Sequence, residues 1–165
     1  MSEPVVLRPL TSDDAPACDA IIASLPYFFG DPQGVRDCAG AARTQSGIVA
    51  LAGEAIVGFL TIERFGPGSA EVTWMAVHAS HRRGGIGRML IDRTAAEMTA
   101  AGARVLFVLT LGPSVPEPEV ADNYAGTRAF YETMGFIPLR EFALATWNDP
   151  AALILVRPLT PRALP

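Results

Sequence analysis

Three glycines, Gly84, Gly85 and Gly87, stand where an expected strand gives way to an expected helix, and this run constrains the chain more than any other feature. A glycine in a helix costs about 1 kcal/mol relative to alanine, so some benefit must offset it here. An anion that approaches bare backbone N–H groups at a helix start supplies that benefit, because no Cβ obstructs it. Three of the chain's 13 arginines surround the same turn: Arg82, Arg83 and Arg88. The segment therefore predicts a phosphate-binding turn.

The simplest alternative is a glycine-rich loop with exposed arginines and no ligand, because short glycine motifs recur by chance. Two other phosphate-binding motifs do not fit. The chain contains no lysine, which excludes the Gly-Lys-Ser/Thr ending of a P-loop. The order Gly-Gly-Ile-Gly is not the spaced dinucleotide fingerprint, and no acidic residue follows about 20 residues downstream as a ribose ligand.

Hydrophobic periodicity and turn residues predict eleven elements in the order βααβββαβαββ. The expected strands cover 5–10, 47–52, 55–64, 70–78, 105–109, 137–145 and 151–156, and the expected helices cover 11–25, 33–43, 85–101 and 122–134. The third helix is expected to bury one face, formed by Ile86, Met89, Leu90, Thr94 and Met98. No linker or repeat divides the chain, so we expect one mixed α/β domain over residues 1–165. The order is not a regular βαβ array, which disfavours a Rossmann fold.

Composition limits the cellular setting and the partners. The chain has 165 residues, of which 50% are hydrophobic and 18% charged, as in a globular protein. No apolar run is long enough for a membrane span, and the first residues do not resemble a signal peptide, so a cytoplasmic location is expected. A net charge of −4 argues against nucleic acid or an anionic membrane as partner. Cys18 and Cys38 have neither metal-type nor redox-type spacing and are expected to be buried thiols.

Two segments resemble the signatures of one family, the GCN5-related N-acetyltransferases (GNAT). Arg82-x-x-Gly85-x-Gly87, after a strand ending in Met75-Ala76-Val77, is similar to the family's Q/R-x-x-G-x-G/A signature. The segment 129–136 (Ala-Phe-Tyr-Glu-Thr-Met-Gly-Phe) is similar to the second signature, a helix that carries Tyr-Glu and closes with Gly-Phe. The resemblance covers nearly the whole chain, because the expected element order also matches.

The resemblance implies a mostly antiparallel central sheet with a splayed parallel strand pair, flanking helices, acetyl-CoA as cosubstrate and no metal. The turn would hold the coenzyme pyrophosphate and the strand main chain would pair with the pantetheine arm. The residues assigned to coenzyme A in this way are Met75, Ala76, Val77, Arg82, Arg83, Gly84, Gly85, Ile86, Gly87, Arg88, Thr110, Asn123 and Thr127. One departure matters: Tyr124 and Thr127 stand where the family commonly has Asn and Ala, and Asn123 is one residue out of register.

The resemblance also assigns two catalytic roles. Tyr131 would stabilise the leaving thiolate through its hydroxyl, and Glu71 would act as the base that deprotonates the amine, through a water. Strand alternation predicts that Glu71, Thr73 and Met75 share one face. The alternatives are a core-packing role for Tyr131, a solvated Glu71, and Glu63 or a chain of waters as the base.

The remaining candidate residues are assigned to the core, to the surface or to acceptor binding. Trp74 is expected in the core, and His78 and His81 suit anion contact or surface exposure rather than catalysis. In this family the acceptor amine is selected by the segment after the first helix and by the last hairpin, here 27–31 and 140–150 with Trp147. Four acids could attract a cationic amine: Asp31, Glu117, Glu119 and Asp122. The sequence therefore predicts an acetyl-CoA-dependent N-acetyltransferase, monomeric or homodimeric, that acts on a small-molecule or peptide amine. The alternative is a non-catalytic acyl-CoA-binding regulatory module.

Overall fold

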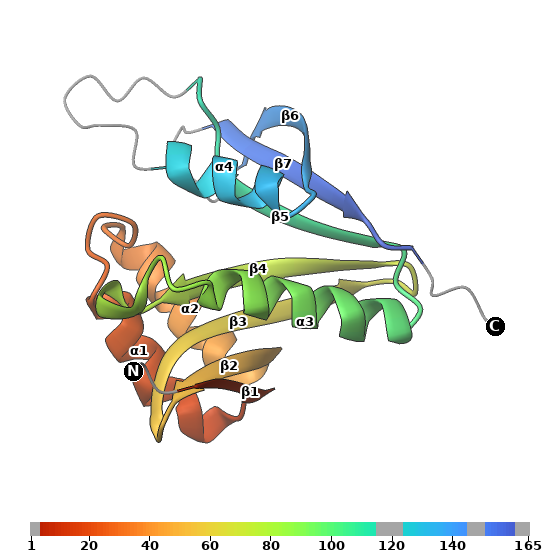
Figure 1. Cartoon of the computed structure of the whole chain (residues 1–165). Helices are drawn as coiled ribbons and strands as arrows, with labels where there is room; N and C mark the ends of the chain where they lie inside the picture. The colour runs from red at the N-terminus through yellow and green to blue at the C-terminus, as the bar shows by residue number, and fades with distance from the viewer. Residues whose placement is uncertain (1–3, 115–123, 145–150, 161–165) are drawn as a thin grey trace.

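A seven-stranded mixed sheet forms the centre of the molecule, with strand order β1-β2-β3-β4-β5-β7-β6 (Figure 1). The computed structural model describes residues 4–114, 124–144 and 151–160. The strands are β1 (Val5–Pro9), β2 (Ser46–Ala52), β3 (Ala55–Phe65), β4 (Ser69–Val77), β5 (Val105–Leu111), β6 (Ile137–Ala143) and β7 (Ala151–Pro158). All neighbours pair antiparallel except β4 and β5, which pair in parallel. The expected mixed α/β fold is confirmed.

Local sequence chemistry explains where the helices begin. The helical elements are η1 (Ser12–Asp14), α1 (Ala15–Ala23), α2 (Pro32–Thr44), η2 (Ala79–His81), α3 (Ile86–Ala100) and α4 (Ala125–Thr133). Asp31 caps α2, because its Oδ2 accepts a hydrogen bond from the backbone N–H of Gly34 at 2.8 Å, and Pro32 opens the helix where no N–H is needed. None of these helices, over the part of the chain that the structure describes, is long and apolar enough to span a membrane.

The parallel strands β4 and β5 stay together over only four residues each. Their register runs from Ser69 opposite Val105 to Val72 opposite Val108 and then ends. Both strands continue, β4 to Val77 paired with β3, and β5 to Leu111 paired with β7. Figure 1 shows the two strands diverging toward the end where η2 and the start of α4 lie. The sheet is thus split into two halves at this end, as the resemblance implied.

Each face of the sheet has its own hydrophobic core. On one face, α3 and α4 pack through residues such as Ile86, Leu90 and Met134 against β2–β5 and β7. On the other, α1 and α2 pack through Ile21, Ile22 and Cys38 against β2–β4. Full burial of one such aliphatic side chain contributes about 1.5–3 kcal/mol, so the two cores hold three layers together.

One expected helix face is corrected by the structure. Met89 is 37% exposed, whereas the buried residues of α3 are Ile86, Leu90, Ile91, Thr94 and Ala95. These residues follow the i, i+4, i+5, i+8, i+9 spacing of one helical stripe, and Met89 lies outside it. Met98 packs partly buried against the same core, as expected. The helix expected over 122–134 is α4, and residues 122 and 123 lie outside the described residues.

Candidate active site

The turn that joins η2 to α3 has an unusual backbone. Arg83 has φ 66° and Gly85 has φ 82°, both in the left-handed region. Glycine adopts this region without cost, whereas a non-glycine residue there is strained and is found mainly at functional sites. Gly85 is also the N-cap of α3. A chain that alternates between right- and left-handed residues turns consecutive N–H groups toward one point, which favours an anion there.

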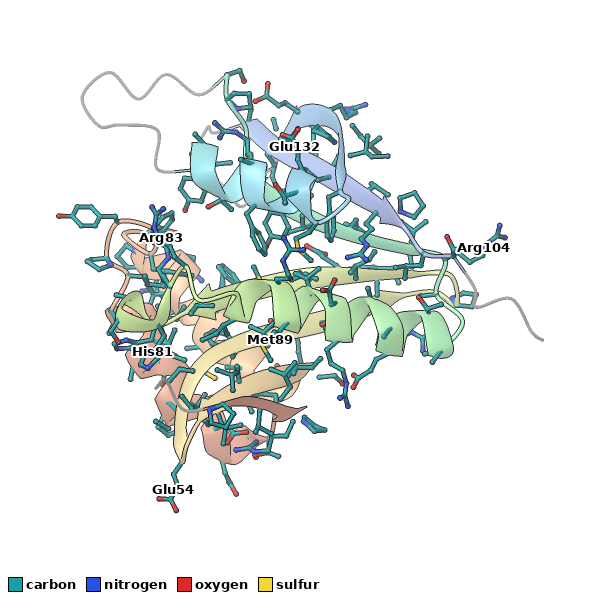
Figure 2. All side chains as sticks on the ribbon, in the orientation of Figure 1. Glu54, His81, Arg83, Met89, Arg104 and Glu132 are labelled. Atoms are coloured by element: carbon teal, nitrogen blue, oxygen red, sulfur yellow. The ribbon has the colours of Figure 1, made fainter. Side chains whose placement is uncertain are left out.

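The start of α3 has no side-chain cap among the described residues, in contrast with α2. Its first N–H groups are therefore available to an external acceptor, and the helix dipole adds about half a positive charge at this end. Arg82, Arg83 and Arg88 are exposed around it. Figure 2 shows Arg83 on the side of the turn that faces α4 and His81 on the far side. These donors and charges fit a pyrophosphate group.

The three glycines of this turn have different structural reasons. Gly85 is required by its backbone angle. A Cβ on Gly87 would lie 3.2 Å from Cζ of Phe130 on α4, so this glycine allows α4 to approach α3 closely. A Cβ on Gly84 would make only an ordinary 3.6 Å contact with the carbonyl of His81. Close helix packing therefore explains Gly87 as well as an anion does, a reason that the sequence alone did not suggest.

A β-bulge in β4 changes which side chains share a face. The β3–β4 register shifts between Thr61 and Ile62, leaving Thr73 as the extra residue. The Thr73 hydroxyl donates to Oε1 of Gln45, the C-cap of α2, at 2.5 Å. Met75 instead approaches α3, with its Cε 4.0 Å from the position of a Cβ on Gly87.

The expectation that Glu71, Thr73 and Met75 share one face is therefore wrong. Val72 belongs to the core under α3, so its neighbour Glu71 faces the same side as Thr73, the side of α1 and α2. A bulge places two residues opposite one on the partner strand and so reverses the alternation beyond it. Glu71 and the Met75 side chain lie on opposite faces. They flank the diverging end of β4 and β5 from two sides.

Glu71 is a partly buried carboxyl beside a second one. It stands opposite Glu63 in the β3–β4 pairing and opposite Phe107 in the β4–β5 pairing. Burial raises the pKa of Glu71 to about 7, and the charge of Glu63 adds to this shift. A carboxyl that titrates near neutral pH can accept a proton and pass it on under ordinary conditions. Glu63 itself is exposed.

Tyr131 lies inside the core that α4 shares with the sheet. It is 5% exposed, and its ring meets those of Phe130 and Phe136 edge-on, each at a centroid distance of 5.3 Å. Burial raises the pKa of its hydroxyl above the usual value, so the group stays protonated and acts as a donor. Its hydroxyl forms no hydrogen bond with the described residues. The residue is thus both a core aromatic and a held hydrogen-bond donor.

The remaining expected coenzyme residues are only partly brought together. Thr110 is buried and pairs with Leu153, beyond the point where β5 leaves β4. Thr127 is half-buried on α4, and Asn123 lies outside the described residues. His78, Ser80 and His81 form a hydrogen-bonded chain through Ser80 Oγ, at 2.8 Å and 2.9 Å from the two Nδ1 atoms. This chain lies just before the turn, and His81 is exposed.

The side of the sheet near α1 and α2 holds one of the two segments expected to select the acceptor, residues 27–31. Trp74 packs there against Phe29, with centroids 6.2 Å apart, so its expected core position is confirmed. Tyr27 is 80% exposed, and the Asp31 carboxylate serves as a helix cap. Trp147, Glu117, Glu119 and Asp122 lie outside the described residues.

The two cysteines belong to the core that α1 and α2 form with the sheet. Cys18 and Cys38 are free and buried, and burial raises the pKa of each thiol to about 12. They are inert packing residues of α1 and α2, as expected. Within residues 4–114, 124–144 and 151–160, no group of three or more His, Cys, Asp or Glu side chains could hold a metal ion.

Comparison with protein families gives the class that this fold and site define. The model described as "Acetyltransferase (GNAT) domain" matches residues 43–138, more than half of the chain. The chain belongs to the GNAT acetyltransferase family. None of the curated proteins matches it significantly.

Solved structures of the same fold cover almost the whole chain at low sequence identity. A GNAT-family protein from Desulfovibrio desulfuricans aligns with TM-score 0.81 and 20% identity over 95% of this chain and 100% of its own. The ribosomal-protein-S18-alanine N-acetyltransferase from Escherichia coli aligns with TM-score 0.74 and 18% identity over 95% of each chain. An aminoglycoside 6'-N-acetyltransferase complexed with coenzyme A aligns with TM-score 0.70 and 14% identity over 95% of this chain and 98% of its own. At these identities the likeness establishes the fold.

Proposed function

We propose that the protein transfers an acetyl group from acetyl-CoA to a primary amine by direct attack of the amine on the thioester. The observation that carries this proposal is the position of Glu71, one residue before the last β4–β5 pair, with a pKa raised to about 7. A neutral-pH base at the point where two strands separate is suited to deprotonating an amine that approaches an acyl group in the gap. The proposal treats residues 1–165 as one N-acetyltransferase domain.

Coenzyme A would be held by groups on the α3 side of the sheet. The N–H groups from Arg82 to Arg88 would bind the pyrophosphate, and the main chain of Met75, Ala76 and Val77 would pair with the pantetheine. Support comes from β5, which forms no pairs with β4 beyond Val72, so that edge of β4 has no strand partner among residues 4–114, 124–144 and 151–160. Unpaired strand N–H and C=O groups are strong donors and acceptors for an extended ligand.

The amine would approach from the α1 and α2 side, where Glu71 lies. A protonated alkylamine has a pKa near 10, so it must lose a proton before it attacks. Glu71 would accept that proton through a water, because its carboxyl already favours the protonated form. The amine nitrogen then forms a bond to the acyl carbon, and the second N–H proton leaves as the tetrahedral intermediate collapses.

The carbon–sulfur bond breaks in that collapse, and the electron pair stays on sulfur. Tyr131 would stabilise the thiolate by donating a hydrogen bond and would keep its own proton. The second proton lost by the amine nitrogen passes, directly or through solvent, to the thiolate, which gives the thiol of coenzyme A. The raised pKa and buried ring of Tyr131 support such a donor. The products are coenzyme A and an N-acetylated amine.

A second candidate function is a module that binds acyl-CoA without turnover. It is disfavoured by the raised pKa of Glu71, because a partly buried carboxyl beside a second carboxyl destabilises the fold and serves no binding role for an anionic coenzyme. The test is thiol release from acetyl-CoA with a panel of polyamines, aminoglycosides, amino acids and peptides. Amine-dependent release supports the enzyme. Coenzyme A binding without release across the whole panel supports the binding module.

A further inference from the structure

Phe28, in the loop between α1 and α2, contacts two elements that lie far away in the sequence. The guanidinium carbon of Arg82 lies 4.8 Å from the centroid of the Phe28 ring. The Tyr124 ring meets the same ring edge-on at 5.7 Å, and the Tyr124 hydroxyl donates to the Phe28 carbonyl at 2.9 Å. One residue therefore joins the loop expected to select the acceptor, the anion-binding turn and the N-cap of α4.

These contacts connect the two halves of the split sheet. Arg82 follows β4 through η2, whereas Tyr124 begins α4, which packs on the β5 and β7 half. The β4–β5 pairing has already ended at Val72, so within the described part of the chain no sheet hydrogen bonds join the halves at this end. Phe28 thus spans the opening at the side where the coenzyme turn lies.

The geometry of Arg82 suits a residue prepared for phosphate. The guanidinium carbon lies over the Phe28 ring, and cation–π attraction holds a guanidinium there without using its N–H groups as donors to another side chain. Among the described residues, Arg82 forms no ion pair with a carboxylate. The ring therefore restricts the side chain to a position beside the anion-binding turn without occupying its donors.

The same loop also reaches the strand that carries the base. Phe29, the next residue, packs its ring against Trp74 of β4 at 6.2 Å. Trp74 adjoins Thr73, whose hydroxyl contacts Thr61 and Gln45 on the face where Glu71 lies. Packed rings therefore connect this loop to the face of the sheet on which the acceptor would approach.

We propose that Phe28 is a positioning residue shared by the coenzyme and acceptor sites. Its ring orients Arg82 for the coenzyme phosphates, and its carbonyl, held by Tyr124, fixes the loop over the opening. Coenzyme binding therefore increases the order of the acceptor loop, and by thermodynamic reciprocity an ordered loop strengthens coenzyme binding. This inference rests on the proposed function, because it takes coenzyme A as the ligand of the turn.

The first test is a double-mutant cycle on coenzyme A affinity, measured by isothermal titration calorimetry. Phe28→Leu keeps the apolar bulk but removes the ring face, and we expect about two- to fivefold weaker binding. In an Arg82→Ala background the same substitution should have almost no further effect. Phe28→Tyr keeps the ring face and should retain wild-type affinity. Phe65→Leu, a change at a half-exposed ring outside these contacts, should also leave affinity unchanged. Fully additive effects of Phe28→Leu and Arg82→Ala would overturn the inference.

The second test follows the loop itself. The chain has two tryptophans, so Trp147→Phe leaves Trp74, which packs against Phe29, as the only tryptophan, and excitation at the red edge of its absorption reports on it selectively. Saturating coenzyme A should change the Trp74 emission, and Tyr124→Phe, which removes the hydroxyl donor but keeps the ring, should reduce that change at least twofold. An equal change in both proteins, or none in either, contradicts the coupling. If coenzyme A fails to bind at all, the proposed function itself is wrong. If coenzyme A binds and the double-mutant cycle is additive, only the role assigned to Phe28 is wrong.

Discussion

Val72 and Val108 form the last pair of the parallel β4–β5 ladder; beyond it Thr73 is the unpaired bulge residue, and Trp74 to Val77 pair with β3 alone. Glu71 is the residue immediately before this last pair, on the face of α1 and α2. The turn that starts α3 follows the diverging end of the same strand. One break in sheet pairing therefore places a titratable carboxyl where an unpaired strand edge begins and an anion-binding turn beyond the other end of that edge.

The pH dependence of turnover tests the carboxyl pair. Glu71 accepts a proton only when ionised, so the rate should rise with pH through about 7 and then level off. Burial is the main cause of the raised Glu71 pKa and the charge of Glu63 adds to it, so Glu63→Gln should move the acidic limb to slightly lower pH. Glu71→Gln should lower the rate by about 10²-fold and abolish that limb. A wild-type profile for Glu71→Gln would exclude this residue as the base.

Tyr131→Phe separates hydrogen-bond donation from packing, because it removes only the hydroxyl from a ring that is 5% exposed. We expect turnover to fall by about 10²-fold while coenzyme A affinity and thermal stability change little. Steady-state rates, calorimetric affinity and melting curves on the same preparation measure all three. Equal losses in rate and stability would instead assign Tyr131 to the core alone.

Gly85→Ala tests the geometry of the turn. The residue has φ 82°, so an alanine there costs about 1–2 kcal/mol and should distort the N–H groups that face the anion. Coenzyme A affinity should fall about tenfold, which corresponds to about 1.4 kcal/mol. Gly40→Ala is the control: it lies inside α2 with no atom within 4 Å of the new Cβ and should stabilise slightly without affecting coenzyme binding. Unchanged affinity in Gly85→Ala would contradict the proposed pyrophosphate site.

Asp14 anchors the start of α1 and gives a prediction on stability. Its carboxylate accepts two hydrogen bonds from the Arg8 guanidinium, at 2.7 and 2.8 Å, and one from the N–H of Thr11. The Arg8 contact lowers the pKa of Asp14 to about 2. Its stabilising contribution is therefore complete above the unfolded value near 4 and is lost as pH falls toward 2.

Urea unfolding at several pH values measures this contribution. Asp14→Asn should cost about 1–2 kcal/mol at pH 7, and the difference from wild type should shrink below pH 4. Asp19→Asn breaks the Arg43–Asp19 pair, whose side chains are 43% and 40% exposed, and should cost less than about 0.5 kcal/mol. A cost for Asp14→Asn that stays constant down to pH 2 would rule out the ion pair as its source.

Features that depend on neighbours in the sequence were predicted well. The order of elements, a helix start within one residue of Gly85 and the apolar run of β5 follow from periodicity and glycine placement, which act over a few residues. Met89 was placed on the wrong side of α3 because a methionine is apolar wherever it stands, and only packing against the sheet selects the buried stripe.

Features that depend on distant contacts could not be predicted. The bulge at Thr73 arises from the β3–β4 register, and it moved Glu71 to the face opposite the Met75 side chain. The contact between Tyr124 and Phe28 joins residues 96 positions apart. The raised pKa of Glu71 likewise needs the burial that tertiary structure provides. The sequence identifies the candidate residues, and the tertiary fold determines their relative positions and contacts.

The most direct test of acetyl transfer at this site follows an isotopically labelled acetyl group from acetyl-CoA into an amine by mass spectrometry, with thiol release measured in the same reaction. We expect labelled N-acetylated amine in equal amount to free coenzyme A for at least one member of the panel. Both products should fall together in Glu71→Gln and Tyr131→Phe. Tight coenzyme A binding with no labelled amine from any acceptor would contradict acetyl transfer at this site.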